Sequence, residues 1–364
     1  MENEKAQNTK TRLESGMNRR DFVKRGLAIG QAVFIGGLLV GNFAGCTTAS
    51  KKAEEANAGR KKSIKFAHIT DTHVTFSGKN GTALKEESFN IFRDVIGQIN
   101  DMPDIDFILF GGDNINNTDS GAKDFNEFMN IMSTVKVPYF AQFGNREVSP
   151  IPPGIALSKN QYAEKMQGHG LDVGRYSWSV PPVPGLRVLG LDTTIEGHDN
   201  GEIIKKELKW IKKEISKHPD DMIVTLSHHL FLPTWGNRDI PKWKKKYLLK
   251  NYQKVNAVLD SAPQVKACLM GHHHVSKIQT INGLHYIASP ATVQYPHAFR
   301  TITVIDKAAR LEFHQIRDQR IIELGKHNLS TSKNAEEYAG GSAGDILAYC
   351  HGSASDNDVV LKLR

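Results

Sequence analysis

Seven side chains of types that bind transition-metal ions fall into five short clusters along this sequence. Each cluster directly follows a short apolar run of the kind that forms a buried strand. In an α/β sheet, ligands bind beyond the carboxyl ends of the strands, so side chains at these positions are expected to converge. A single Asp after a strand is usually a turn or a helix cap, but five such clusters together indicate a shared metal site. The seven side chains are Asp71, His73, Asp113, Asn145, His228, His272 and His274.

The elements that must position these side chains alternate between strands and helices. Apolar residues at helical spacing separate the strand-type runs, as at Phe89, Phe92 and Ile96. This alternation predicts an α/β fold, and a chain of 364 residues is long enough for one large domain with appendages. The predicted strands that lead into the five clusters are 64–71, 107–110, 139–143, 222–226 and 265–270.

The composition narrows the class of protein. With 39% hydrophobic and 24% charged residues, the chain is globular, which excludes disorder, collagen or coiled coil as the main architecture. Three cysteines cannot form a disulfide framework in a chain of this length. The net charge of +8 includes a basic N-terminal segment, and the remainder is only mildly basic, so no nucleic-acid partner is expected.

The order of the five clusters closely resembles that of the calcineurin-like metallophosphoesterase family. The family pattern is D-x-H, G-D, G-N-x-E, a single His and G-H-x-H, and the resemblance covers residues 64–305. It implies a four-layer α/β/β/α sandwich with mixed sheets that binds two metal ions. The motifs stand here as Asp71-Thr72-His73, Gly112-Asp113, Gly144-Asn145-Arg146-Glu147, His228 and Gly271-His272-His273-His274. Carried over residue by residue, the ligands are Asp71, His73 and His274 for one ion and Asn145, His228 and His272 for the other, with Asp113 bridging both.

The chemistry of these side chains agrees with that ligand set. Imidazole together with carboxylate favours Mn, Fe, Zn, Co or Ni over calcium and leaves the identity of the ion open. Asn145 adds an oxygen ligand without negative charge, which keeps the site electropositive toward a phosphate. Two such cations about 3.5–4 Å apart lower the pKa of a bridging water and orient it toward phosphorus. We therefore expect two divalent metal ions, and hydrolysis of a phosphodiester, a phosphoanhydride or an activated phosphate ester by the hydroxide that they generate.

The third motif departs from the family pattern at Arg146. That place usually holds a histidine, which is thought to help protonate the leaving group. Arginine stays protonated up to pH about 12 and cannot transfer a proton at neutral pH, but it can bind a phosphate oxygen and stabilise its charge. A similar G-N-R variant occurs in the branch that cleaves the pyrophosphate of UDP-diacylglucosamine. We expect Arg146 to have this catalytic role, with alkyl phosphomonoesters as poor substrates; the alternative is a plain ion pair with Glu147.

Three further positions are candidates for roles at the active site. His229, beside the ligand His228, is either a substitute catalytic acid or a structural support for its neighbour. Tyr295 and Arg300 lie in a segment that resembles the one after the G-H-x-H motif in cyclic-nucleotide phosphodiesterase-like members, and they are candidates for substrate binding. The alternative for these two is a packed aromatic ring and a surface charge. Purple acid phosphatases have Tyr three residues after the bridging Asp, where this chain has Asn116, so no ferric-tyrosinate centre is expected.

The first 46 residues have the features of an export signal. Residues 18–24 resemble a twin-arginine signal, and residues 26–45 contain no charged side chain. The uncharged run ends at Cys46 in a sequence that resembles a bacterial lipobox, so Cys46 is the candidate for lipidation; an uncleaved membrane anchor is the alternative. The expected divisions are a signal over 1–46, a flexible tether over 47–63, the metallophosphoesterase domain over 64–320 and a partly ordered C-terminal tail over 321–364.

These features predict a phosphoesterase exported by the twin-arginine machinery and held at the periplasmic or outer face of a bacterial membrane. Its substrate is expected to be a phosphorylated small molecule or lipid, with cyclic nucleotides as the alternative. A different class of protein, a catalytically silent lipoprotein that binds a phosphorylated ligand, also stays open. A two-metal amide hydrolase fits the motif order poorly.

Overall fold

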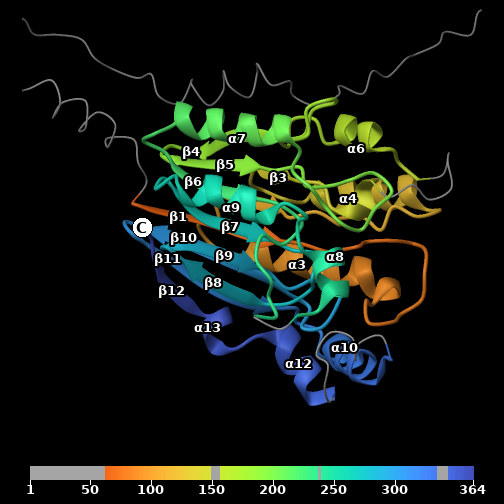
Figure 1. Cartoon of the computed structure of the whole chain (residues 1–364). Coiled ribbons are helices and arrows are strands. Elements are labelled where there is room, and N and C mark those ends of the chain that lie inside the picture. The colour runs from red at the N-terminus through yellow and green to blue at the C-terminus, as the bar shows by residue number, and fades with distance from the viewer. Residues whose placement is uncertain (1–61, 149–155, 237–238, 334–342) are drawn as a thin grey trace, which may run out of the picture. The chain divides into compact units, whose positions relative to one another are not determined.

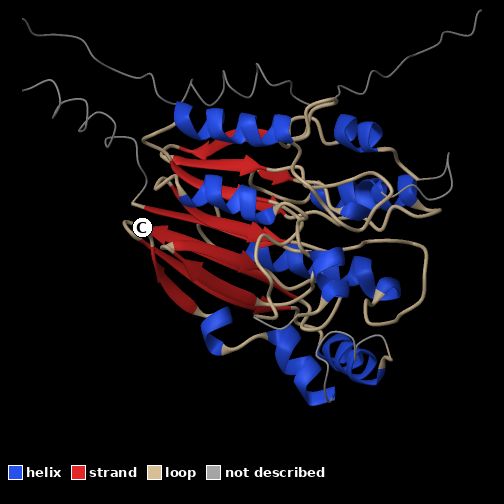
Figure 2. Ribbon diagram, in the orientation of Figure 1, coloured by secondary structure: helices blue, strands red, loops and turns tan. Residues whose placement is uncertain are grey.

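The computed structural model describes residues 62–148, 156–236, 239–333 and 343–364. Within these ranges, two six-stranded mixed sheets pack face to face and helices cover their outer faces (Figure 1, Figure 2). The predicted four-layer α/β/β/α sandwich is therefore confirmed. The first sheet has the order β12 (Val359–Lys362), β11 (Ala308–Gln315), β10 (Ala298–Ile305), β1 (Ser63–Ile69), β2 (Phe107–Phe110) and β3 (Tyr139–Ala141). The second sheet has the order β4 (Trp178–Val183), β5 (Leu186–Gly190), β6 (Met222–Leu226), β7 (Val265–Met270), β9 (Leu284–Ala288) and β8 (Lys277–Ile281).

The strands that lead into the predicted metal site are the parallel ones. β1, β2 and β3 are parallel neighbours in the first sheet, as are β5, β6, β7 and β9 in the second. Parallel strands that are covered on both faces form continuous apolar runs, and β2 is buried at every position. Because neighbouring parallel strands end at the same edge, the loops that follow them in each sheet gather there.

Four amphipathic helices form the two outer layers. The first sheet is covered by α3 (Ser88–Asp101) and α4 (Gly121–Met132), and the second by α7 (Lys205–Lys217) and α9 (Tyr252–Asp260) (Figure 1). α7 buries Ile211 and Ile215 while most of its lysines face solvent. Shorter helices lie in the connecting segments: η1 (Lys85–Glu87), α5 (Asn145–Val148), α6 (Lys159–Lys165) and α8 (Pro241–Tyr247).

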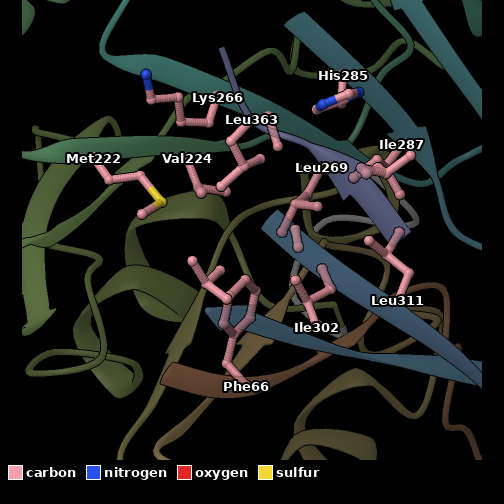
Figure 3. Close-up of a pocket in the computed structure, with 14 residues that line it drawn as sticks. Phe66, Met222, Val224, Lys266, Leu269, His285, Ile287, Ile302, Leu311 and Leu363 are labelled. Atoms are coloured by element: carbon pink, nitrogen blue, oxygen red, sulfur yellow. The ribbon is translucent and has the colours of Figure 1, made fainter. Parts of the chain in front are cut away.

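The interface between the two sheets contains a small cavity of about 20 Å³ (Figure 3). Phe66 and Ile302 of the first sheet face Val224 and Leu269 of the second across it. None of the predicted metal ligands lines this cavity. It is a packing gap in the apolar core and holds no place for a substrate.

The C-terminal segment is more structured than the predicted tail. Its described parts form α10 (Gln319–Thr331), α12 (Ala343–His351), α13 (Ala354–Asn357) and β12, which pairs with β11 at the edge of the first sheet. The last residue, Arg364, donates through its guanidinium to the backbone oxygens of Leu259 and Ala262 at the end of α9, each at 2.9 Å. The chain end therefore joins the first sheet to the helix layer of the second.

The signal, Cys46 and residues 47–61 of the tether lie outside the described residues. Over the ranges that the structure does describe, no helix has the length and apolar character needed to cross a membrane.

Candidate metal centre

The structure brings all seven predicted ligands together at the carboxyl ends of five parallel strands. Six of them are buried, and His274 is partly exposed. The ligands follow β1 (Asp71 and His73), β2 (Asp113), β3 (Asn145), β6 (His228) and β7 (His272 and His274). Both sheets therefore contribute to one site, which lies where their carboxyl edges meet.

One group of ligand atoms is formed by Asp71, His73 and His274. The Oδ1 atom of Asp71 lies 3.2 Å from Nε2 of His274 and 3.7 Å from Nε2 of His73. The two imidazole Nε2 atoms are 3.4 Å apart. Three donor atoms thus surround one point, as the ligands of a metal ion do.

A second group contains Asp113, His228 and His272, and Asn145 lies beside it. The Nε2 atom of His228 is 3.1 Å from Oδ1 of Asn145 and 3.5 Å from Oδ2 of Asp113. The same Oδ2 atom of Asp113 is 3.4 Å from Nε2 of His73 in the first group. Asp113 therefore lies between the two groups, in the position that a bridging carboxylate requires.

The backbone at these ligands adopts an uncommon conformation. Asp71, His73, Asp113, His272 and His274 all have positive φ angles, between 40° and 69°. Non-glycine residues seldom adopt this left-handed region, and such strain tends to occur at functional sites. The surrounding structure holds the ligands in a geometry that their local sequence alone does not favour.

The glycines of the second and third motifs allow the loops after β2 and β3 to touch. A Cβ atom on Gly112 would lie 2.4 Å from the backbone nitrogen of Gly144, and one on Gly144 would lie 2.1 Å from Oδ1 of Asp113. Gly112 also has a φ of +92°, which glycine adopts without cost. The G-D and G-N motifs thus need glycine because two backbones and a ligand carboxylate occupy the same space.

The buried carboxylate of Glu147 fixes these same loops. It accepts hydrogen bonds from the backbone N–H groups of Asp113, Asn114, Ile115 and Gly144, at 2.7–3.1 Å. Burial, and next the carboxylate of Asp113, raise the pKa of Glu147 to about 7. All of its oxygens face backbone donors, and within the described structure it makes no ion pair with Arg146.

Three ligand histidines are oriented through the ring nitrogen that faces away from the site. Nδ1 of His228 lies 3.0 Å from the backbone oxygen of Gly111, and Nε2 of His272 lies 3.1 Å from that of Lys246. Nδ1 of His274 lies 3.2 Å from Oε1 of Gln294. An acceptor at one nitrogen places the proton there and leaves the other nitrogen available to a metal ion.

The electrostatics of the site favour positive charge. Burial alone would raise the pKa of Asp71, but nearby histidines, His274 foremost, outweigh it and hold that pKa well below its usual range. Burial would lower the pKa of His228, but the carboxylates of Asp113 and Asp71 raise it to about 9. Two buried carboxylates therefore create a field that stabilises cations.

The donor set fits two metal ions. Oδ1 of Asp71 is buried without a hydrogen-bond partner among the described residues, although three imidazole Nε2 atoms lie within 4.0 Å of it. A buried carboxylate oxygen without a donor is costly, and a cation would satisfy it. Asp71, His73 and His274 would hold one ion, Asn145, His228 and His272 the other, and Asp113 both. When bound, such ions act as Lewis acids and lower the pKa of water.

The remaining predicted site residues divide into two kinds. Arg146 belongs to the site, since its backbone N–H donates to Oδ1 of Asp113 at 2.7 Å. The ring of His229 binds other parts of the chain: its Nδ1 is 2.7 Å from Oγ1 of Thr193, and its Nε2 is 3.1 Å from the backbone oxygen of Asp199. Burial, and next the charge of His228, lower the pKa of His229 to about 3. A neutral ring with both nitrogens engaged fits the structural role better than that of a catalytic acid.

Tyr295 and Arg300 lie in the interior. Arg300 is fully buried, and its guanidinium donates to Oγ of Ser276 and to the backbone oxygen of Asn357. Burial lowers the pKa of Arg300 to about 10. Tyr295 is 7% exposed, with its ring 6.3 Å from that of His351 in α12. Arg300 is thus neither a surface charge nor placed to contact a substrate, because the C-terminal segment covers it, and Tyr295 packs as an aromatic ring.

Sequence reasoning missed two residues that surround the centre. Gln294 orients His274, and Asp199 accepts from Nδ2 of Asn145 at 3.1 Å. Each is far from the residue that it serves along the chain. Only the G-N motif gave a hint of Asp199, because an amide that binds a metal through oxygen needs an acceptor for its nitrogen.

A class of protein follows from this geometry together with known sequences. The family model for calcineurin-like phosphoesterases matches residues 64–276. The chain belongs to this family, and it is a metal-dependent hydrolase that acts on phosphoester bonds, as predicted.

Individual relatives share only a modest fraction of identical residues with this chain. The chain is 28% identical over 233 residues to the 3',5'-cyclic adenosine monophosphate phosphodiesterase CpdA of Haemophilus influenzae, over 64% of this chain and 77% of that protein. It is 26% identical to CpdA of Escherichia coli, over 69% of this chain and 86% of the other. Among solved structures, a dimetal phosphatase from Danio rerio superposes with a TM-score of 0.54 at 18% identity, covering 69% of this chain and 95% of that one. This last likeness concerns the fold.

Proposed function

We propose that this protein hydrolyses phosphodiesters or phosphoanhydrides in preference to alkyl phosphomonoesters. The observation behind this proposal is the placement of Arg146, whose backbone N–H binds Asp113 at the centre. A permanent cation there cannot donate a proton to the leaving group. His229, the neighbouring histidine that binds no metal in our ligand set, is buried and engaged at both nitrogens. Substrates whose leaving group departs without much protonation are therefore favoured.

The reaction is a displacement at phosphorus. The oxygen of water forms a bond to phosphorus and the water gives up a proton to solvent. The bond from phosphorus to the leaving oxygen breaks, and the leaving oxygen keeps the electron pair. Arg146 binds a phosphoryl oxygen and stabilises the negative charge that develops there. Metal ions at the centre, when bound, supply the activated water.

A cyclic nucleotide is the second candidate substrate. It is supported by the relatives named as 3',5'-cyclic adenosine monophosphate phosphodiesterases, which this chain matches over most of their length. The leaving oxygen of that substrate is a sugar alkoxide, which needs a proton more than an anhydride oxygen or an aryl oxide does. Arg146 therefore weighs against it.

The test uses the full chain loaded with Mn²⁺ and three substrates: bis(p-nitrophenyl) phosphate, 3',5'-cyclic adenosine monophosphate and glycerol 3-phosphate. We expect the aryl diester to be cleaved with the largest kcat/KM and the alkyl monoester with the smallest. Arg146→His is the matched variant, because it restores an imidazole and should narrow the difference between alkyl and aryl substrates. Faster cleavage of the alkyl monoester by the wild type would refute the proposal, and two bound metals with no turnover would favour the silent binding protein.

We further propose that the protein is exported by the twin-arginine route and held at a bacterial membrane by a lipid on Cys46. The support is the sequence pattern of residues 18–46. In a bacterial host, Cys46→Ala should release the protein from the membrane fraction, and Arg19→Lys together with Arg20→Lys should keep it in the cytoplasm. A Cys46→Ala protein that stays in the membrane fraction would indicate an uncleaved anchor instead.

A further inference from the structure

Asp199 places an exposed carboxylate beside the metal centre. Its Oδ1 atom accepts a hydrogen bond from Nδ2 of Asn145 at 3.1 Å. The oxygen of the same amide, Oδ1 of Asn145, lies 3.1 Å from Nε2 of the ligand His228. A single side-chain amide therefore separates the carboxylate of Asp199 from the atoms that would bind a metal ion.

The loop that carries Asp199 is fixed to the body of the protein. Its two ends are joined by a β-bridge between Thr194 and Gly201. The ring of His229 also contacts the loop, with Nε2 3.1 Å from the backbone oxygen of Asp199. Because a carbonyl oxygen can only accept, this nitrogen of His229 donates the hydrogen. Contacts to both its backbone and its side chain thus hold Asp199 beside the centre.

The charge of Asp199 differs in its surroundings from the charges of the ligand carboxylates. Asp71 and Asp113 are buried among the imidazoles, whereas Asp199 is exposed to solvent. Its side chain binds the neutral amide of Asn145 and makes no ion pair with any residue that the structure describes. A substrate enters the centre from solvent, so its phosphoryl group meets this negative charge as well as the cations of the site.

We propose that Asp199 disfavours substrates whose phosphoryl group carries two negative charges. This inference rests on the proposed function and adds to it a criterion of charge: the singly charged phosphoryl group of a diester is favoured over that of a monoester, whatever the leaving group. Arg146 and bound metal ions attract both kinds of substrate, but Asp199 repels the second charge of a monoester. For charges about 7 Å apart near a protein surface, one such repulsion changes relative affinity about tenfold.

Two substitutions separate the charge of Asp199 from its hydrogen bond. Asp199→Asn removes the charge but keeps an oxygen that can accept from Asn145, whereas Asp199→Ala removes both. Asp199→Ala should therefore also weaken metal binding, because the amide of Asn145 loses the partner that orients it. Glu196→Gln is the matched control: Glu196 is an exposed carboxylate of the same loop, and it contacts no metal ligand in the described structure.

Binding is measured first, by calorimetry at pH 8 on the full chain saturated with Mn²⁺. The probes are phenylphosphonate, which carries mainly two negative charges at this pH, and methylphenylphosphinate, which carries one; neither contains an ester bond. We expect Asp199→Asn to raise the affinity for the phosphonate relative to the phosphinate about tenfold at unchanged metal content, and Glu196→Gln to change this ratio less than about twofold. An unchanged ratio in Asp199→Asn would overturn the proposal, even if Asp199→Ala alters it, because a purely structural role needs only the hydrogen bond.

Kinetics with one shared leaving group separate this proposal from the function on which it rests. Methyl p-nitrophenyl phosphate and p-nitrophenyl phosphate both release p-nitrophenolate, but only the second carries two charges. We expect Asp199→Asn to raise kcat/KM for the monoester relative to the diester about tenfold. Equal effects on both substrates would refute the role of Asp199 and leave the proposed function intact. A wild type that cleaves glycerol 3-phosphate faster than the aryl diester would refute the proposed function, and the calorimetric ratio would still decide the role of Asp199.

Discussion

The two sheets supply chemically different halves of the metal centre. Strands of the first sheet place every oxygen ligand, namely Asp71, Asp113 and Asn145, whereas the second sheet places only imidazoles, including His228 and His272. The anionic oxygens offset the charge of the cations and link the two groups of ligands. The imidazoles supply the remaining ligand atoms of each group.

The two halves are also held in place differently. On the first sheet, the buried carboxylate of Glu147 binds four backbone N–H groups and so fixes whole loops. On the second, each imidazole has its own acceptor, such as Gln294 for His274. This difference indicates that a substitution in the half supplied by the first sheet should disable the whole centre. A substitution in the half supplied by the second sheet should weaken metal binding by one ligand, and a higher metal concentration should offset that loss.

The largest effect is expected from Asp113→Asn, which removes the bridging charge. Both groups of ligands lose the carboxylate that they share, so the bound metal should fall below two ions per chain and kcat/KM should drop by about 10³-fold or more. Elemental analysis of the dialysed protein and steady-state kinetics measure the two effects. Asp239→Asn, at an exposed carboxylate, is the control. Two retained metals with unchanged activity would refute the bridging role.

The next effect concerns Glu147→Gln. The amide presents its NH₂ group to backbone N–H donors, so buried donors lose their acceptor, at a cost of about 1–3 kcal/mol. We expect the free energy of unfolding in urea to fall by about that amount even without metal, together with an activity loss of about 100-fold, because the loops that hold Asp113 and Asn145 shift. If the urea midpoint of the metal-free variant equals that of the wild type, Glu147 does not fix the first half.

A smaller effect, which depends on the metal concentration, is expected in the half of the metal centre that the second sheet supplies. Gln294→Leu removes the acceptor of Nδ1 on His274, and such losses weaken metal binding by about 10–100-fold. Excess Mn²⁺ should therefore restore most of the activity, and Gln294→Glu, which keeps an acceptor oxygen, should bind metal close to the wild-type affinity. Metal titrations of activity and of bound metal provide the comparison. An activity loss that excess metal does not reverse would mean that the two halves do not differ as argued.

The sequence predicted the parts of the centre that depend on local motifs. The seven ligands follow apolar strands, and strand ends in a parallel sheet converge, so their meeting was predictable. Gln294 and Asp199 were not, because their roles depend on contacts between segments far apart in the chain. Arg300 was misjudged for the same reason: Asn357, in the segment predicted to be a tail, covers it. Composition alone does not show that a Gly- and Ser-rich segment ends in a strand that completes a sheet.

The smallest effect tests a histidine that is not among the metal ligands. His297 is buried, and its Nδ1 lies 2.9 Å from the backbone oxygen of Thr292. Burial lowers the pKa of His297 to about 4. An imidazole with a lowered pKa stabilises the fold fully above the unfolded value of about 6.5, and this contribution is lost as the pH falls toward 4. Between pH 7.5 and 5.5 the loss amounts to about 1 kcal/mol for this one group.

His297→Asn removes that titration and tolerates the positive φ of 54° at this position. The free energy of unfolding in urea, measured at pH 7.5 and 5.5, should therefore fall by about 1 kcal/mol less in the variant than in the wild type. The metal ligands titrate in both proteins, so their contribution cancels in this difference of differences. Equal losses in the two proteins would show that acid sensitivity resides in the centre alone, and that His297 gains its proton in the folded state as readily as in the unfolded one.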